Sequence, residues 1–127
     1  MTGWQSASSI RVVGRWSVLR LTGELDIESV PVVEELLVRL LTLEKPVVVI
    51  DLREVTFFDC ALLGVLCRTR AGVLAAGGRF AVLCTRPWAL KIMRLADLLE
   101  AFGPVASLAD LADLDALDSS PGRGSRA

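Results

Sequence analysis

Carboxylates and thiols are the side chains of this 127-residue chain that could do chemistry. The carboxylates near the ends of apolar, strand-like segments are Glu24, Asp26, Asp51, Glu54 and Asp59. Paired carboxylates can perform acid–base catalysis when their surroundings separate their pKa values. The chain has no histidine, so the commonest general base and metal ligand is missing. Since no nucleophile accompanies these acids, turn and helix-cap chemistry is the favoured interpretation.

The three cysteines, Cys60, Cys67 and Cys84, fall in apolar segments, and their spacing fits neither a zinc site nor a CxxC pair. This pattern predicts reduced thiols in a cytoplasmic protein. A thiol-dependent enzyme at Cys60 is the alternative, but it would lack a histidine and a second cysteine nearby. Neither GxxxxGKS/T nor GxGxxG occurs. We therefore expect no enzymatic activity, no metal and no cofactor.

The composition predicts one folded domain. Hydrophobic residues make up 53% of the chain and the net charge is -1. These values favour a packed core and give no sign of binding to nucleic acid or to a membrane surface. No apolar run reaches the roughly 20 residues that span a bilayer. We expect a flexible leader at residues 1–9, the domain at 10–117 and a disordered polar tail at 118–127.

Alternating apolar and polar residues at the start of the domain predict a β-hairpin made of Ile10–Val13 and Trp16–Leu21. A helix should follow, because leucine and valine recur at helical spacing. Ser29 is its expected N-cap, and Pro31 is tolerated in the first turn, where N–H groups lack partners. The β-branched run Val47–Ile50 then predicts a central strand that is covered on both faces.

The rest of the domain continues the alternation. After a strand end at Asp51 and a loop with two phenylalanines, a helix should begin at Asp59 or Cys60 and stop at a Gly77-Gly78 pair. The later elements are a strand at Phe80–Cys84, a helix at 85–98, a short strand near Val105 and a capping box at Ser107–Asp110. This order predicts an α/β fold: a mixed sheet, mostly parallel in its core with an N-terminal hairpin, packed against about four helices.

The junction Phe58-Asp59-Cys60 is the best candidate for a binding surface. A helix N-terminus carries unpaired N–H groups and presents its side chains to solvent or to a partner. Gly64, in the first turns of this helix, costs about 1 kcal/mol relative to alanine, and we interpret it as a place of close backbone approach. A second candidate is the leucine-rich segment 108–117, which is either a closing helix or a helix that binds a partner.

Three segments in order resemble the STAS domain and, within it, the bacterial anti-sigma factor antagonists. Leu21–Asp26 is similar to the family's GELD signature. Val48–Asp59 looks like the strand and loop that lead to the regulatory helix. Ala75–Leu83, followed by Pro87, resembles the next helix-to-strand turn and the third helix. The resemblance covers residues 10–117 and implies the STAS fold.

The resemblance implies a protein that docks onto a serine-kinase-type anti-sigma factor and so regulates transcription by partner switching. In the family, the kinase phosphorylates a Ser or Thr directly after the aspartate that matches Asp59. Here that position is Cys60, so we expect docking without phosphorylation control. A lesser departure is Asp97, where the family has glycine; aspartate can adopt the left-handed conformation. The partner-binding positions that the resemblance implies are Glu24, Asp26, Phe58, Asp59, Cys60, Ala61, Leu62 and Leu63.

A degenerate STAS scaffold or dimerisation module is the alternative function. The N-terminal hairpin could pair across an open sheet edge with a second copy. Trp4, Trp16 and Trp88 are candidate interface anchors, although core packing is the favoured interpretation for the last two. Cys60 is expected to be an inert, serine-sized residue, with redox sensing as the alternative.

Overall fold

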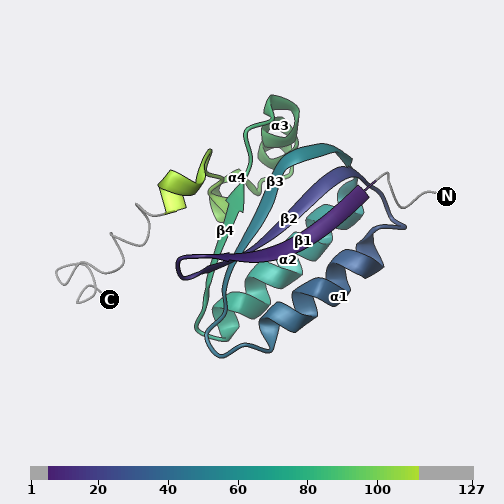
Figure 1. Cartoon of the computed structure of the whole chain (residues 1–127). Helices are drawn as coiled ribbons and strands as arrows, with labels where there is room; N and C mark the ends of the chain where they lie inside the picture. Colours follow the sequence, from purple (N-terminus) through teal and green to yellow (C-terminus); the bar gives the residue numbers. More distant parts are fainter. Residues whose placement is uncertain (1–5, 112–127) are drawn as a thin grey trace.

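A four-stranded mixed sheet forms the centre of the protein (Figure 1). The computed structural model describes residues 6–111. The strands, in sheet order, are β1 (Ser6–Val13), β2 (Trp16–Leu25), β3 (Val47–Phe58) and β4 (Arg79–Leu83). Strand β1 pairs antiparallel with β2, whereas β2, β3 and β4 run parallel. The predicted mixed sheet with an N-terminal hairpin is confirmed.

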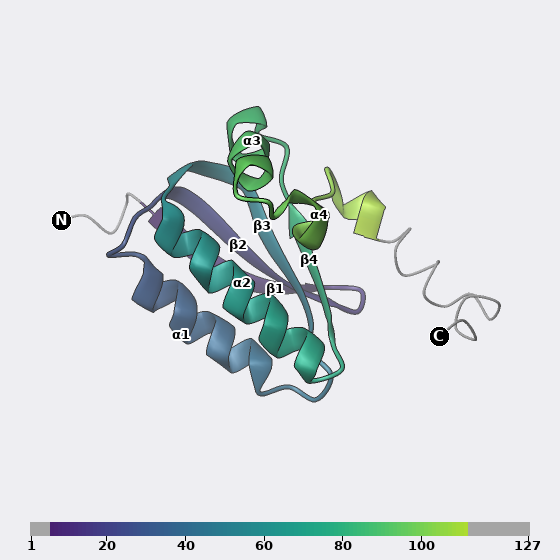
Figure 2. The same cartoon turned by 180° about the vertical axis from the view of Figure 1, so that it is seen from behind.

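The longer helices α1 (Val30–Leu41) and α2 (Cys60–Ala75) lie side by side over one face of the sheet (Figure 2). Helices α3 (Pro87–Leu95) and α4 (Leu99–Phe102) follow β4, and a further helical turn begins at Leu108. The helix predicted for residues 85–98 is thus shorter than expected. The leucine-rich segment is described only as far as residue 111, so most of it lies outside the described residues.

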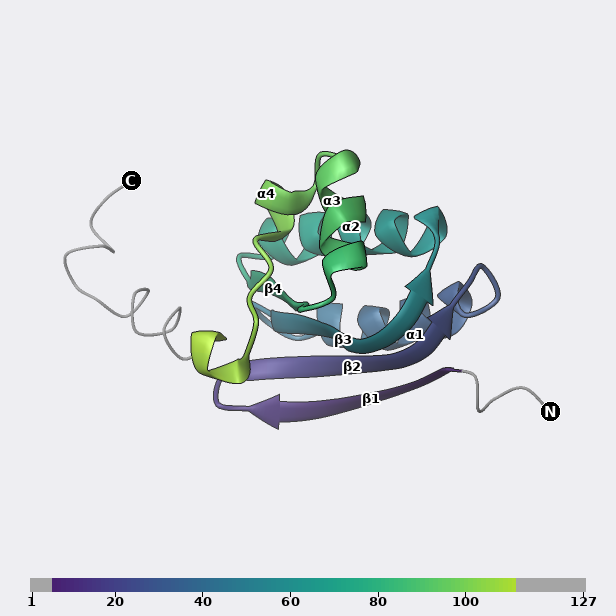
Figure 3. The same ribbon diagram turned by 90° about the horizontal axis from the view of Figure 1, so that it is seen from above.

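Both faces of the sheet are covered, but unequally. The main core lies between the sheet and helices α1 and α2, with fully buried Leu19, Ile50 and Leu62 among its members. A smaller cluster on the other face contains Trp16 and Leu111. The turn at residues 108–111 lies beside the start of β2 (Figure 3). The two-sided cover explains why Val47–Ile50 contains no polar residue.

The strands extend beyond their predicted ends. Strand β1 begins at Ser6 rather than Ile10, because its serines pair along β2 as far as Gly23. Strand β2 continues through residues 22–25, and β3 continues through the segment that was expected to be a loop. Two register shifts place one extra β3 residue opposite β2 each time. These bulges bury Leu52, Val55 and Phe58, a three-residue spacing that hides the strand pattern.

The predicted turn residues act as expected. Helix α2 stops where the N–H of Gly78 donates to the Val73 carbonyl (2.8 Å), with Gly77 at φ 78°. A methyl group on Gly78 would overlap the Pro46 carbonyl oxygen, so a side chain is excluded there. Helix α3 ends in the same way at Asp97, whose φ is 62°. Its expected left-handed conformation is confirmed.

The capping box near the C-terminus is also confirmed. The Ser107 N–H donates to Asp110 Oδ2 (3.2 Å), and the Asp110 N–H donates to Ser107 Oγ (3.4 Å). The strand expected near Val105 is reduced to a single bridge with Leu83. Ser29 occupies the N-cap position of α1 but makes no capping bond there, since its hydroxyl donates to Asp26 instead.

Candidate partner-binding site

The carboxyl ends of β2 and β3 bring the candidate residues together. Glu24 pairs with Phe57 and Leu25 pairs with Phe58 across the two strands. Asp26 and Asp59 directly follow these strand ends. Since carboxyl ends of parallel strands share one edge of a sheet, residues more than 30 positions apart form a single surface. We call this edge, with the first turn of α2, the junction surface.

The first turn of α2 presents Cys60 to solvent. Asp59 is the N-cap: its backbone is extended, and its Oδ1 accepts from the Ala61 N–H at 3.0 Å. Helix α2 therefore begins at Cys60, whose side chain is exposed. The N-cap bond holds the Asp59 carboxylate beside Cys60 and supplies the helix N-terminus with a negative charge.

The predicted partner-binding residues fall into three groups by exposure. Glu24, Asp26 and Cys60 are exposed, while Asp59 and Ala61 are half-buried. Those with buried side chains are Phe58, Leu62 and Leu63. The buried three belong to the main core and can support the junction surface only from beneath.

Helix α3 helps to hold Phe58 in place. The Phe58 ring lies 5.1 Å from the Trp88 ring, centroid to centroid, at an interplanar angle of 43°. Trp88 is half-buried, and Trp16 is buried with the Arg79 guanidinium 4.7 Å over its ring. Core packing is thus confirmed for both tryptophans, whereas Trp4 lies outside the described residues.

The carboxylates serve turns, caps and ion pairs, as the favoured interpretation has it. Asp26 Oδ1 accepts from the backbone N–H of Glu28 (3.0 Å) and of Ser29 (3.2 Å) in the turn before α1. Glu54 forms an exposed ion pair with Arg20 at 3.1 Å. Asp51 and Glu54 lie inside β3 rather than at its end, which corrects their predicted placement.

Asp51 is a buried carboxylate that is held by one arginine. Its side chain is 3% exposed and accepts from the Arg53 guanidinium twice, at 3.0 and 2.9 Å. Burial raises the pKa of Asp51, but hydrogen bonds and charge from Arg53 outweigh it and leave the pKa below its ordinary value. Arg86 in turn donates to the Arg53 carbonyl at 3.0 Å. This network joins the first bulge of β3 to the start of α3.

Two exposed apolar residues at the junction surface were not among the predicted site residues. Ile27 is 69% exposed and Phe57 is 48% exposed. The sequence contained a signal for the exposure of Phe57. Neighbouring strand residues point to opposite faces, so Phe57 and Phe58 could not both be buried on one face of the sheet. Ile27, between Asp26 and Glu28, is an apolar residue in an acidic turn. Apolar side chains surrounded by charge are typical of partner-binding surfaces.

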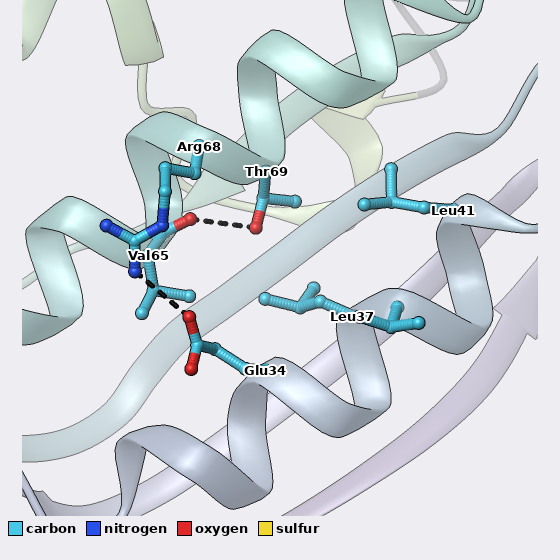
Figure 4. A pocket seen from close by; sticks show the side chains of 7 residues that line it. Glu34, Leu37, Leu41, Val65, Arg68 and Thr69 are labelled. Carbon is cyan, nitrogen blue, oxygen red and sulfur yellow. Dashed lines mark hydrogen bonds and ion pairs between the residues drawn. The ribbon is translucent and has the colours of Figure 1, made fainter.

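A shallow groove of about 190 Å³ lies between α1 and α2 (Figure 4). Its lining is apolar apart from buried Thr69 and the ion pair between Arg68 and Glu34, at 2.9 Å. The groove is smaller than ordinary small-molecule sites, which begin near 300 Å³. Gly64 lies nearby, and a methyl group there would meet only the Arg68 guanidinium, at 3.4 Å. The predicted close backbone approach at Gly64 is therefore wrong within this chain.

The thiols are separate from one another. All three cysteines are free: Cys60 is exposed, Cys67 is half-buried and Cys84 is buried. Burial raises the pKa of the Cys84 thiol. Among residues 6–111, no group of three or more cysteine and acidic side chains could hold a metal ion. In the same part of the chain, no helix is long and apolar enough to cross a membrane.

The fold and the junction surface define a small α/β domain with a mixed sheet and an exposed helix N-terminus at the carboxyl edge of that sheet. A family profile described as "Mlab, STAS domain" matches residues 8–117, so the chain belongs to the STAS domain family. No curated protein matches the chain.

Several solved structures share this fold, and anti-sigma factor antagonists are among them. One, from Mycobacterium paratuberculosis, is 24% identical, with a TM-score of 0.78 over 86% of this chain and 92% of that one. The phosphorylated form of the Bacillus cell fate determinant SpoIIAA is 19% identical, with a TM-score of 0.67 over 85% and 99%. A STAS domain protein from Planctomyces limnophilus is 18% identical, with a TM-score of 0.70 over 79% and 89%. The predicted STAS fold is confirmed.

Proposed function

We propose that this STAS domain acts in the cytoplasm as an anti-sigma factor antagonist, binding a serine-kinase-type anti-sigma factor through the junction surface. The observation that carries the proposal is the exposed first turn of α2, where Cys60 follows the N-cap Asp59. Anti-sigma factor antagonists with similar folds support it. The acids and exposed Phe57 beside this turn offer a charged rim around an apolar centre, as binding sites often do.

The same turn argues against control by phosphorylation. SpoIIAA of Bacillus has a phosphorylated form. In this chain the position after Asp59 is a thiol, which a serine kinase cannot convert to phosphoserine. A phosphate at this position would add close to two negative charges next to the Asp59 carboxylate, and would oppose docking by like-charge repulsion and by the cost of desolvating the phosphate. Without the hydroxyl, the antagonist stays competent to bind, and its abundance sets its activity.

A kinase assay with a matched pair of variants tests both parts. A kinase-type anti-sigma factor from the same genome is titrated with wild-type protein, Cys60→Ser and Cys67→Ser, with and without ATP. We expect all three to bind without ATP, and only Cys60→Ser to be phosphorylated and released with ATP. Cys67 is the control, since it is half-buried on the same helix. Failure of every such kinase to bind wild-type protein would contradict the docking proposal. If Cys60→Ser bound the kinase but was not phosphorylated, only the match between Cys60 and the family's phospho-acceptor position would be contradicted.

A thiol-dependent enzyme at Cys60 is not proposed. The chain contains no histidine to act as its base. Titration of the native protein with a thiol reagent near neutral pH checks this choice. Reaction at the rate of an ordinary exposed cysteine agrees with an inert residue, whereas reaction many times faster would reopen the enzyme and redox hypotheses.

A further inference from the structure

The two edges of the sheet, β1 and β4, differ in whether another segment covers them. At β4, residue Val105 continues the ladder: its N–H donates to the Val82 carbonyl (2.9 Å), and its carbonyl accepts from the Cys84 N–H (3.0 Å). At β1, no strand among the described residues pairs with the outer side. Strand β1 is eight residues long and contains no proline, lysine or acid, the residues that usually protect an edge. Its single charged residue is Arg11.

The outward edge of β1 also carries exposed apolar side chains. Ile10 pairs with Leu19, which is buried against the helices, so Ile10 and Val12 point toward the helical layer. They lie beyond the helices that would cover them: Ile10 is 39% exposed and Val12 is 71% exposed. A solvent-facing strand side without a functional reason would normally carry polar residues.

Helix α1 also carries an exposed apolar side chain. Figure 3 shows α1 nearer than α2 to β1. Helical spacing places Val38 and Leu41 toward the groove with α2, and therefore places Val32 on the opposite flank of α1. Val32 is 55% exposed. Val32 thus adds an exposed apolar side chain on the flank of α1 that faces away from α2.

We propose that the outer side of β1, with exposed Ile10 and Val12, is the interface of a homodimer in which two β1 strands pair antiparallel. A two-fold axis perpendicular to the sheet and passing beside Ile10 would pair residues 7–13 of both copies. The two sheets would join into one of eight strands, with both helical layers on the same side. The inference is independent of the junction surface.

Charge and side-chain size fit a second copy as the occupant. In this register Arg11 lies opposite Ser9 of the other copy, and Ile10 lies opposite Ile10 of the other copy. No like charges therefore meet between the two β1 strands. The two α1 helices would run antiparallel. Exposed Glu35 and Arg39, one turn apart, would then each approach the opposite charge on the other copy. An interface of this kind is self-complementary, as two-fold symmetry requires.

Light scattering with charge variants tests the dimer. Ile10→Lys would place two ammonium groups opposite each other across the axis, and Val12→Lys would put a charge into the interface. Leu95→Lys is the control, because Leu95 is 74% exposed on α3, away from this edge. We expect twice the chain mass for the wild type and for Leu95→Lys, and a twofold lower mass for both β1 variants with unchanged circular dichroism.

Other results overturn the proposal. A monomeric wild type at concentrations up to hundreds of micromolar would exclude the dimer, and a dimeric Ile10→Lys with dimeric Val12→Lys would place it on another surface. If the β1 variants lose their circular dichroism, Ser8→Pro decides in their place, because the Ser8 N–H points away from β2 and its loss weakens pairing at the open edge without removing a hydrogen bond between β1 and β2. Titration with the kinase-type anti-sigma factor separates the two proposals, because Ile10→Lys should bind it as the wild type does.

Discussion

The two halves of β3 differ in their strand pairing and in their pattern of burial. Val47–Asp51 pairs with β2 on one side and β4 on the other without irregularity. Leu52–Phe58 pairs only with β2 among the described strands and contains both bulges. In the first half almost every side chain is buried. In the second half burial falls on every third residue, which leaves Glu54, Thr56 and Phe57 exposed.

The regular half of β3 contributes mainly to the core, whereas the bulged half also contributes exposed side chains to the surface. The regular half is surrounded by other strands and both cores, so it has no surface for a partner. The bulged half twists away from the sheet, as bulges do, and carries exposed side chains to the junction surface. It is nevertheless anchored, because Leu52, Val55 and Phe58 remain in the main core. Substitutions at the buried positions of the bulged half should therefore destabilise the protein as much as those in the regular half. Substitutions at its exposed positions should have little effect on stability.

Phe58→Ala should have the largest effect on stability. Its ring is 3% exposed and packs on Trp88, so truncation leaves a cavity and removes an aromatic pair. We expect the free energy of unfolding, measured by urea denaturation, to fall by about 4 kcal/mol. The control is Ile50→Ala in the regular half, for which about 3 kcal/mol is expected. If Phe58→Ala lowered it by less than about 1 kcal/mol while Ile50→Ala kept its effect, the bulged half would be a loosely held segment.

Asp51→Ala tests the boundary between the halves. The substitution removes a buried carboxylate and leaves Arg53, which is one-third exposed, without its ionic partner. We expect the free energy of unfolding to fall by about 3 kcal/mol at neutral pH, the low end for breaking a buried ion pair. The measurement is urea denaturation in buffers of different pH.

Acid should remove the advantage of the wild type over Asp51→Ala. The pKa of Asp51 is lowered by folding from its ordinary 3.8. Its contribution is therefore complete at pH values above that ordinary pKa and is lost as the pH falls through the lowered one. The difference between wild type and Asp51→Ala should shrink in that acid range. A difference that stayed constant from neutral pH to well below pH 3.8 would show that Asp51 acts through packing rather than charge.

The same contrast explains which features could be predicted from the sequence. Val47–Ile50 was predicted as a covered central strand, because a β-branched run has one simple meaning. The turn at Gly77-Gly78 and the capping box at Ser107–Asp110 were predictable too, since each depends on local backbone chemistry. The bulged half was mistaken for a loop, because two extra residues change a two-residue pattern of burial into a three-residue one.

The position of the candidate site could be predicted from the sequence, but the set of residues that surround it could not. The Asp59 cap and the exposure of Cys60 follow from the position of both residues at a helix start. That Glu24 lies beside Phe57 depends on pairing between distant strands and on their shifted register. The resemblance implies that Leu62 and Leu63 are partner-binding positions, whereas the structure shows both side chains buried in the main core. Sequence spacing alone does not show which side of α2 meets the sheet.

Glu54→Gln should have a small effect on stability. The Arg20–Glu54 pair spans the first bulge at 3.1 Å, but both side chains are about half exposed. Exposed ion pairs contribute about 0–1 kcal/mol, so we expect the free energy of unfolding to change by less than about 1 kcal/mol. The same urea series at low and at high salt checks the cause, because salt screens a surface pair. A loss as large as that of Asp51→Ala would mean that this pair fixes the bulge.

Phe57→Ser should have the smallest effect on stability and a clear effect on binding. Half of the Phe57 side chain is already in solvent, so we expect the free energy of unfolding to change by about 0.5 kcal/mol or less. Aromatic anchors at the centre of an interface typically contribute about 2 kcal/mol or more, which corresponds to at least a tenfold loss of affinity for the kinase-type anti-sigma factor. Isothermal titration calorimetry measures that loss.

Leu74→Ser is the matched control for Phe57→Ser. Its side chain is 47% exposed against 48% for Phe57, but it lies in the last turn of α2, at the opposite end from Cys60. Leu74→Ser should leave the affinity for the anti-sigma factor unchanged. If Leu74→Ser weakened binding and Phe57→Ser did not, the partner would contact the far end of α2. The bulges of β3 would then shape the fold without presenting a binding surface.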